Sequence, residues 1–139
     1  MLGTLLRSMG RSMGRSRNSQ PMPEPRRGDI WTAVFHRDIQ GSEQQYPRPV
    51  LVVSSDLLNR IPESMVVVAP ITRTDRGIPW HVRIPADRAT GLDVPSVVLL
   101  DQIRAADRGR LTKKHGEAPP AVMQAVRDEL SSLLSLEDL

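Results

Sequence analysis

The sequence predicts a mainly β, barrel-like domain that is closed by one C-terminal helix and preceded by a disordered tail. Three observations lead to this fold class. Short apolar runs rich in β-branched residues alternate with glycines and prolines along the middle of the chain. The C-terminal residues change to a helical apolar period. The first 27 residues are of low complexity, and 139 residues leave room for one domain with one modest core.

Residues 1–27 are predicted to be disordered, and the folded domain is predicted to span 28–139. The tail contains RSMGRSMGRS, and such a segment cannot bury enough surface to offset its ordering entropy. Six arginines and one glutamate give it a net charge of +5, whereas the other 13 basic and 15 acidic residues give the domain −2. Two interpretations stay open: translation that starts at Met9, Met13 or Met22, or a basic arm that gathers RNA.

The composition excludes several kinds of site. The chain has no cysteine, which rules out disulfides and thiolate metal ligands, and its three histidines lack ligand spacing, so no metal or other cofactor is expected. Four aromatic residues are too few for a platform that stacks RNA bases in series. No apolar run reaches about 18 residues and no secretory signal is recognisable, so a cytoplasmic protein without membrane segments is expected.

The first elements of the domain are expected in this order. Ile30–Phe35 is rich in β-branched and aromatic residues, which is typical of a strand. The polar stretch Asp38–Pro47 predicts a long loop. Pro49–Val53 and Met65–Ile71 are continuous apolar runs, and these predict buried strands.

The remaining elements are shorter. Ser54–Asn59 predicts a helical turn whose free amides are capped by Ser55 or Asp56. Further strands are predicted at Trp80–Ile84, Ser96–Ile103 and Arg110–Lys114. A helix follows from the pair Pro119-Pro120, which suits a first helical turn. Its apolar stripe, packed on the core or on a second copy, consists of Val122, Met123, Val126, Leu130, Leu133 and Leu134.

Arg48 and Thr72 are predicted to lie at the same edge of the sheet. The strands that precede and follow the short helical turn have a short connection, so they run antiparallel as neighbours. The start of the first strand then lies beside the end of the second. The segment Ser42-Glu43-Gln44 enters this edge and Arg73 leaves it. A guanidinium, hydroxyls, a carboxylate and an amide gathered in one area indicate a site for a phosphodiester.

Metal-free cleavage of RNA makes three demands on such a site. The 2′-hydroxyl must lose a proton, the departing 5′-oxygen must gain one, and charge on the phosphoryl oxygens must be stabilised. Arginine suits the third task through its forked donors, and threonine adds a hydrogen bond. Arginine is a poor general base because its pKa lies far above neutral pH, so the guanidinium stays protonated.

Four blocks of the sequence resemble the MazF/PemK family in order and spacing: RRGDIW, GSEQQYPRPVLVVSSDLLNR, VAPITR and LLDQIRAADRGRL. The resemblance covers residues 27–136. It implies a homodimer of SH3-like barrels and a toxin restrained by a co-expressed, MazE-like antitoxin. It also implies metal-independent, sequence-specific cleavage of single-stranded messenger, ribosomal or transfer RNA, which leaves 2′,3′-cyclic phosphate and 5′-hydroxyl ends and arrests growth.

Carried over residue by residue, the resemblance makes Arg48 the catalytic arginine that precedes proline and Thr72 the catalytic threonine. It places Ser42-Glu43-Gln44 in the segment that covers the active site and contacts RNA, and Gln102 near the bound bases. Arg73, at the exit of the strand that ends with Thr72, is a further RNA-binding candidate. One departure from the family pattern follows this segment. Gln45-Tyr46-Pro47 replaces a stretch that more often contains glycine, which predicts a stiffer loop with a different base preference.

Two other functions are compatible with the predicted fold. The first is a non-catalytic toxin, similar to CcdB, that binds DNA gyrase. The second is a plain SH3-like interaction module. The presence of both Arg48 and Thr72 favours the ribonuclease, and the scarcity of aromatic residues disfavours the module.

Structural roles compete with functional ones for single residues. Arg48 could pair with a surface carboxylate, and Thr72 could cap a turn. His81 is more typical of a satisfied structural histidine than of a catalytic base. Asp101 is expected to form an ordinary ion pair with Arg104 or Arg108.

Overall fold

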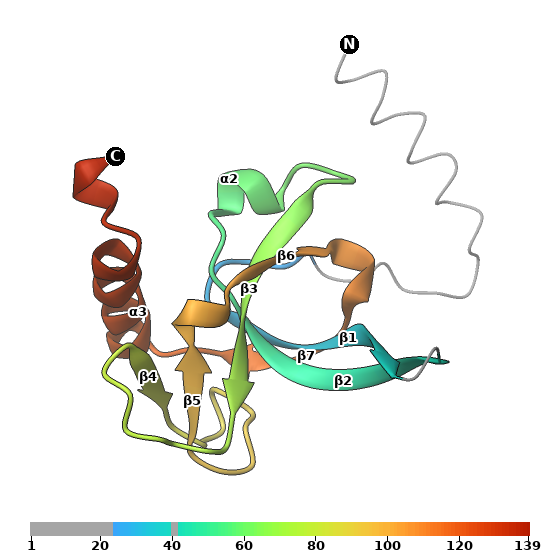
Figure 1. The fold of residues 1–139 in the computed structure, drawn as a ribbon, viewed down its shortest axis with the longest axis horizontal. Helices are drawn as coiled ribbons and strands as arrows, with labels where there is room; N and C mark the ends of the chain where they lie inside the picture. Colours follow the sequence, from blue (N-terminus) through green and yellow to red (C-terminus); the bar gives the residue numbers. More distant parts are fainter. Residues whose placement is uncertain (1–23, 40–41) are drawn as a thin grey trace.

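The computed structural model describes residues 24–39 and 42–139, and only the backbone at 37–39 and 42–45. Disorder is predicted for residues 1–27, of which 1–23 lie outside the described residues. At the end of this segment the Arg26 and Arg27 amides instead hydrogen-bond to the domain. In the described residues seven strands and one long helix are arranged as Figure 1 shows. In chain order the elements are β1 (Asp29–Ile39), β2 (Ser42–Val52), α2 (Asp56–Asn59), β3 (Met65–Thr72), β4 (His81–Ile84), β5 (Ser96–Leu99), the 3-10 turn η1 (Leu100–Gln102), β6 (Arg104–Asp107), η2 (Arg108–Arg110), β7 (Leu111–Glu117), α3 (Pro120–Leu133) and η3 (Leu136–Asp138).

Neighbouring strands all pair antiparallel, in the order β4-β5-β3-β2-β1-β7, with β6 beside β3. Strand β3 is shared: its first half pairs with β6, its middle with β2 and its last two residues with β5. The β1–β2 hairpin, β3 and β7 curve around one interior, and α3 lies beside β4 (Figure 1). The predicted mainly β domain with a closing helix is confirmed.

Buried side chains form two clusters, one on each face of the central strands. The cluster inside the barrel consists of Trp31, Ala33, Phe35, Val50, Val52, Val66, Val68, Ala106 and Leu111. The cluster beneath α3 consists of Ile30, Leu51, Val53, Ala69, Ile71, Val82, Ile84, Val98, Leu100, Val122 and Val126. Successive side chains of a strand point to opposite faces, so a strand buried on both faces needs a continuous apolar run. This requirement explains the runs PVLV in β2 and VVVA in β3.

The prediction of a loop over Asp38–Pro47 is wrong, because the backbone continues as a β-hairpin. Strand β1 runs to Ile39, β2 starts at Ser42, and the two strands pair residue by residue along their length. Ladder hydrogen bonds join backbone groups whatever the side chains are, so a polar composition does not exclude a strand. The segment Ser42-Glu43-Gln44 belongs to β2, and its side chains lie outside the described ones.

Two other strand predictions are corrected. The strand expected over Ser96–Ile103 ends at Leu99, where the chain enters η1. Strand β6 is missing from the predicted elements because its sequence, RAAD, has no β-branched or aromatic residue. It forms because β3 offers a free edge, with Val66 opposite Ala106. Tertiary pairing here outweighs a weak local signal.

Helix α3 begins at the predicted proline pair. Val122 and Val126 are buried in the core, and Leu130 packs against it. Leu133 and Leu134, at the end of the predicted stripe, are 38% and 46% exposed. Packing on the core therefore accounts for the stripe as far as Leu130, and packing of its end on a second copy stays a prediction. None of the described helices is both long and apolar enough to cross a membrane.

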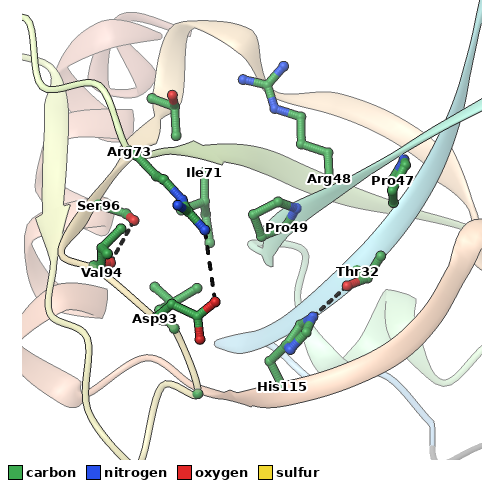
Figure 2. A pocket seen from close by; sticks show the side chains of 13 residues that line it. Thr32, Pro47, Arg48, Pro49, Ile71, Arg73, Asp93, Val94, Ser96 and His115 are labelled. Carbon is green, nitrogen blue, oxygen red and sulfur yellow. Dashed lines mark hydrogen bonds and ion pairs between the residues drawn. The ribbon is translucent and has the colours of Figure 1, made fainter.

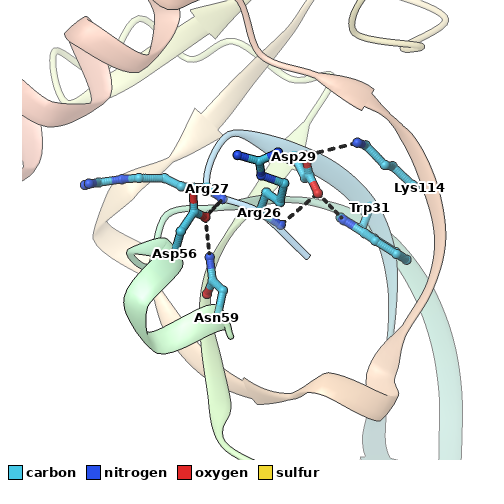
Figure 3. Close-up of polar contacts among 7 residues, drawn as sticks. All are labelled: Arg26, Arg27, Asp29, Trp31, Asp56, Asn59 and Lys114. Carbon is cyan, nitrogen blue, oxygen red and sulfur yellow. Dashed lines mark hydrogen bonds and ion pairs between the residues drawn. The ribbon is translucent and has the colours of Figure 1, made fainter. Parts of the chain in front are cut away.

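The chain enters the domain through a polar network around Asp29, which is 1% exposed (Figure 3). Asp29 Oδ2 accepts hydrogen bonds from the Arg26 amide at 2.8 Å and from Trp31 Nε1 at 3.1 Å. Asp29 Oδ1 lies 3.3 Å from Lys114 Nζ on β7. The Arg27 amide donates to the first residue of α2 at 2.7 Å. These contacts fix the start of β1 against β7 and α2.

Candidate active site

Arg48 and Thr72 lie where β2 and β3 separate. The two strands pair as far as Val50 and Pro70, and the same register, continued by two residues, would put Arg48 opposite Thr72. Instead, the last two residues of β3 pair with β5. The prolines at 47, 49 and 70 have no N–H to donate, so the strands separate without leaving amides of these residues unpaired.

A pocket of about 270 Å³ lies at this separation (Figure 2). The residues that line it are Thr32, Pro47, Arg48, Pro49, Ile71, Thr72, Arg73, Gly91, Leu92, Asp93, Val94, Ser96 and His115. Two guanidinium groups, a carboxylate, an imidazole and three hydroxyls therefore share one small space. The structure brings Arg48, Thr72 and Arg73 together here, as the strand geometry predicts.

Arg48 is half-buried on β2. Among the side chains that the structure describes, no carboxylate pairs with it, so the interpretation of Arg48 as half of a surface ion pair is not supported. The forked donors of a guanidinium match the oxygens of a phosphate. Arg48 is therefore suited to bind an anion that enters the pocket.

Thr72 and Arg73 leave the end of β3 at the same pocket. Thr72 Oγ1 accepts a hydrogen bond from the Thr74 amide at 3.3 Å, which is the turn-capping role. A hydroxyl that accepts one bond keeps its own proton to donate, so this cap is compatible with ligand binding. Arg73 Nη2 lies 3.8 Å from Asp93 Oδ2, and both side chains are more than 70% exposed. Such a solvent-exposed pair is weak, and an anionic ligand can displace it.

His115 is one of several lining residues that sequence reasoning misses. It comes from β7, and its Nε2 forms a hydrogen bond with Thr32 Oγ1 on β1 (Figure 2). The contact joins positions 83 residues apart, because β1 pairs with β2 on one side and with β7 on the other. In the run LTKKHGE the histidine is one polar residue among several. No local signal could have assigned it to the pocket.

The loop that precedes β5 forms one wall of the pocket and is held firmly. Thr90 is fully buried, and its amide donates to Asp87 Oδ1 at 2.9 Å within a tight turn. The Glu117 amide donates to the Ala89 carbonyl at 2.8 Å, which ties this loop to β7. The following residues bring Asp93 to the pocket.

Gln102 does not line the pocket. It is exposed at the end of η1, after β5. The side chains of Ser42-Glu43-Gln44 lie outside the described ones. Within the described part of the chain, no group of three or more His, Cys, Asp or Glu residues could hold a metal ion.

The prediction of an ion pair between Asp101 and Arg104 or Arg108 is wrong. Asp101 Oδ1 lies 3.5 Å from His81 Nε2, and the His81 side chain is 6% exposed. The Arg104 guanidinium instead lies over the Phe35 ring, 4.4 Å from its centroid. Arg108 donates to a backbone carbonyl. Sequence proximity suggested the pairing, but a strand and a 3-10 turn aim these side chains elsewhere.

The fold and the site together define a class of protein: a small antiparallel β domain that carries an arginine and a threonine where two strands separate. The chain belongs to the PemK-like, MazF-like toxins of type II toxin-antitoxin systems, whose family profile matches residues 26–134. This membership does not support the alternative of a gyrase-binding, CcdB-like toxin.

Individual relatives are similar over nearly their whole length. The endoribonuclease EndoA of Bacillus subtilis is 38% identical over 114 residues, which are 81% of this chain and 97% of EndoA. MazF in the MazE-MazF crystal structure from Deinococcus radiodurans is 33% identical, with a TM-score of 0.68 over 81% of this chain and 97% of that one. A mycobacterial endoribonuclease in complex with its cognate antitoxin is 29% identical, with a TM-score of 0.63 over 81% and 96% of the two chains.

Proposed function

We propose that this protein is the toxin of a type II toxin–antitoxin pair and acts as a metal-independent, sequence-specific endoribonuclease on single-stranded RNA. One observation carries the proposal: Arg48, without a carboxylate partner among the described side chains, shares a pocket with Thr72 at the separation of two strands. Membership of the toxin family and relatives named endoribonucleases support it.

Arg48 and Thr72 are the catalytic residues of this proposal. The substrate's 2′-oxygen attacks the phosphorus, and the bond to the 5′-oxygen breaks, which leaves a 2′,3′-cyclic phosphate and a 5′-hydroxyl. Negative charge grows on the non-bridging oxygens during this step. The Arg48 guanidinium stabilises that charge with two parallel hydrogen bonds, and the Thr72 hydroxyl adds a third.

The nucleotides on either side of the scissile bond extend beyond the pocket. Arg73 lines the pocket and meets the RNA backbone after its weak pair with Asp93 opens. Ser42-Glu43-Gln44 precedes Arg48 on the same strand and contacts bases there. Gln102 is exposed on η1 and reads a more distant base. These four positions contribute to the choice of bases, whereas Arg73 contributes to affinity.

The proposal includes the partners that the family implies. A MazE-like antitoxin with acidic and apolar residues would cover the basic pocket, and solved relatives include toxins bound to antitoxins. A homodimer would cover leucines that one chain leaves exposed near its C-terminus, namely Leu133, Leu134 and Leu136. The toxin domain spans 28–139 and follows a basic tail, residues 1–27, whose last two residues hydrogen-bond to the domain. The protein acts in the cytoplasm.

The deciding experiment is cleavage of a long single-stranded RNA by purified protein in excess EDTA. Wild-type protein is expected to make discrete cuts with cyclic-phosphate ends, and Arg48→Ala and Thr72→Ala are expected to make none. Arg127→Ala is the matched control, because Arg127 is exposed on α3 and does not line the pocket. Intact RNA after incubation with folded wild-type protein, across several sequences, would contradict the proposal.

A further inference from the structure

We propose that Tyr46 is an RNA-binding residue whose ring stacks on a base next to the scissile phosphate. This role rests on the proposed ribonuclease function and deepens it, because it adds a contact with a base to the contacts that Arg48 and Thr72 make with the phosphate. The ring is a feature of this chain: Gln45-Tyr46-Pro47 stands where the family more often has a stretch with glycine, which has no side chain to stack.

Tyr46, Arg48 and Thr72 lie on one face of the sheet. Successive side chains of a strand alternate between the two faces. On β2, Val50 belongs to the cluster inside the barrel and Tyr46 packs against that cluster, so Arg48, midway between them, is on the same face. On β3 the same alternation puts Thr72 on this face, because Val68 belongs to the same cluster.

The opposite face of β2 carries other residues of the pocket. Pro49, next to Arg48, pairs with Thr32, whose hydroxyl bonds the His115 ring. Figure 2 shows the Arg48 guanidinium pointing away from that ring. A phosphate bound by Arg48 therefore lies on the Tyr46 side of β2 rather than on the His115 side.

The spacing of Tyr46 and Arg48 suits two adjoining parts of one RNA strand. Side chains two residues apart on a β-strand leave the backbone about 7 Å from each other. A base that adjoins a bound phosphate is within this reach, and the bases of single-stranded RNA are free to stack on an aromatic side chain. One ring that holds one base agrees with the small number of aromatic residues, which excludes only stacking in series.

The protein holds the Tyr46 ring in place. Phe35 is opposite Tyr46 on β1, with the ring centroids 6.0 Å apart and the ring planes inclined by 43°. The Arg104 guanidinium lies over Phe35, 4.4 Å from its centroid. Pro47 follows Tyr46, and a residue before proline is restricted to extended backbone. Tyr46 is half-buried, so it remains accessible to a ligand, and a side chain that is already packed loses little entropy when it binds one.

The test measures the Kd of the full-length protein for three RNAs that contain its cleavage site, made uncleavable by a 2′-deoxy group at the scissile position. One RNA has all its bases. In the other two an abasic nucleotide replaces the nucleotide on the 5′ or on the 3′ side of the scissile phosphate. Tyr46→Leu keeps an apolar side chain against Phe35 but removes the aromatic ring. Tyr46→Phe is the matched control, because it keeps the ring.

Tyr46→Leu is expected to raise the Kd for the RNA with all its bases by about 5- to 150-fold, which is the range for the loss of one stack between a base and an aromatic ring. One of the two abasic RNAs should bind Tyr46→Leu and wild type equally well, because neither complex has the stack, and this equality also shows that the variant is folded. Tyr46→Phe should bind all three RNAs as wild type does.

An unchanged Kd of Tyr46→Leu for the RNA with all its bases would overturn the proposed role of Tyr46. The same loss of affinity on all three RNAs would overturn it too, because a purely structural role of Tyr46 gives that result. If folded wild-type protein cleaves no RNA and thus has no cleavage site, the proposed ribonuclease function itself fails, which is a different result from these two.

Discussion

The α-carbon of Gly91 lies directly against the main chain of His115: a Cβ built at Gly91 would be 2.2 Å from the His115 carbonyl oxygen. Gly116, the next residue on β7, is equally close to the loop, with an ideal Cβ 2.2 Å from the Ala89 carbonyl oxygen. Real Cβ atoms do not approach backbone atoms this closely. Two glycines therefore allow the loop before β5 and strand β7 to touch, and this contact joins two walls of the pocket.

Gly91→Ala should destabilise the fold by about 2–4 kcal/mol, because it adds a steric clash to an unfavourable backbone conformation. Gly77→Ala separates the two effects. Both glycines have a φ of +69°, but a Cβ at Gly77 would meet nothing within 4 Å. The backbone conformation alone should cost about 1 kcal/mol at Gly77. Urea unfolding of both variants measures the difference, and equal losses would show that the close approach at Gly91 does not matter.

The sequence predicts the β2–β3 edge because the information is local. Two apolar runs with a short connection determine an antiparallel pair, and that pair brings Arg48 and Thr72 together. The helix α3 is equally local, since its prolines and apolar period are adjacent in the chain. These features follow from residue types and spacing, without knowledge of the remaining fold.

The features that sequence reasoning misses depend on distant pairing. Strand β6 forms on the free edge of β3. His115 reaches the pocket because β7 pairs with β1, far away in the sequence. A single sequence does not record such pairings, so His115 could not be assigned to the pocket. The polar end of the β1–β2 hairpin is missed for another reason, because its pairing is local but its polar side chains carry no strand signal.

Arg48→Lys should fail to rescue the activity that Arg48→Ala loses. Lysine keeps the positive charge but is a point charge without the planar fork of donors that binds two phosphoryl oxygens at once. We expect kcat to fall about 100- to 1000-fold, as for the loss of one preorganised donor to a developing charge. Binding of an uncleavable RNA with a 2′-deoxy group at the scissile position should change much less. Activity of Arg48→Lys close to that of wild type would mean that charge alone is required.

The hydrogen bond between Thr32 and His115 should stabilise the pairing of β1 with β7. Thr32→Val removes the hydroxyl that the imidazole bonds, whereas Thr32→Ser keeps it. The lost hydrogen bond should lower the free energy of unfolding by about 1 kcal/mol. Thr32→Ser should recover it. Urea unfolding of the two variants is the measurement, and a Thr32→Val protein as stable as wild type would show that this bond contributes nothing.

Asp56 should give the protein an acid-sensitive part of its stability. The Arg27 amide donates to Asp56 Oδ1 at 2.7 Å, and Asn59 Nδ2 donates to the same oxygen at 3.2 Å (Figure 3). The bond from the Arg27 backbone is the largest cause that lowers the pKa of Asp56 below its ordinary value of 3.8. Since these bonds favour the carboxylate of the folded state, the stabilisation is complete above the unfolded-state pKa. It is lost as the pH falls through the lower, folded-state pKa.

Asp56→Asn tests this dependence because it keeps an acceptor oxygen and removes the charge. At pH 7 the variant should be less stable than wild type by about 1 kcal/mol or less, since solvent screens a partly exposed group. The difference should shrink as the pH falls below about 4, where the wild-type carboxyl begins to take up its proton. Urea unfolding at a series of pH values measures it. Glu137→Gln, an exposed change near the C-terminus, should show no such convergence. A stability difference for Asp56→Asn that stays constant from pH 7 to below about pH 3 would show that the Arg27 contact does not depend on charge.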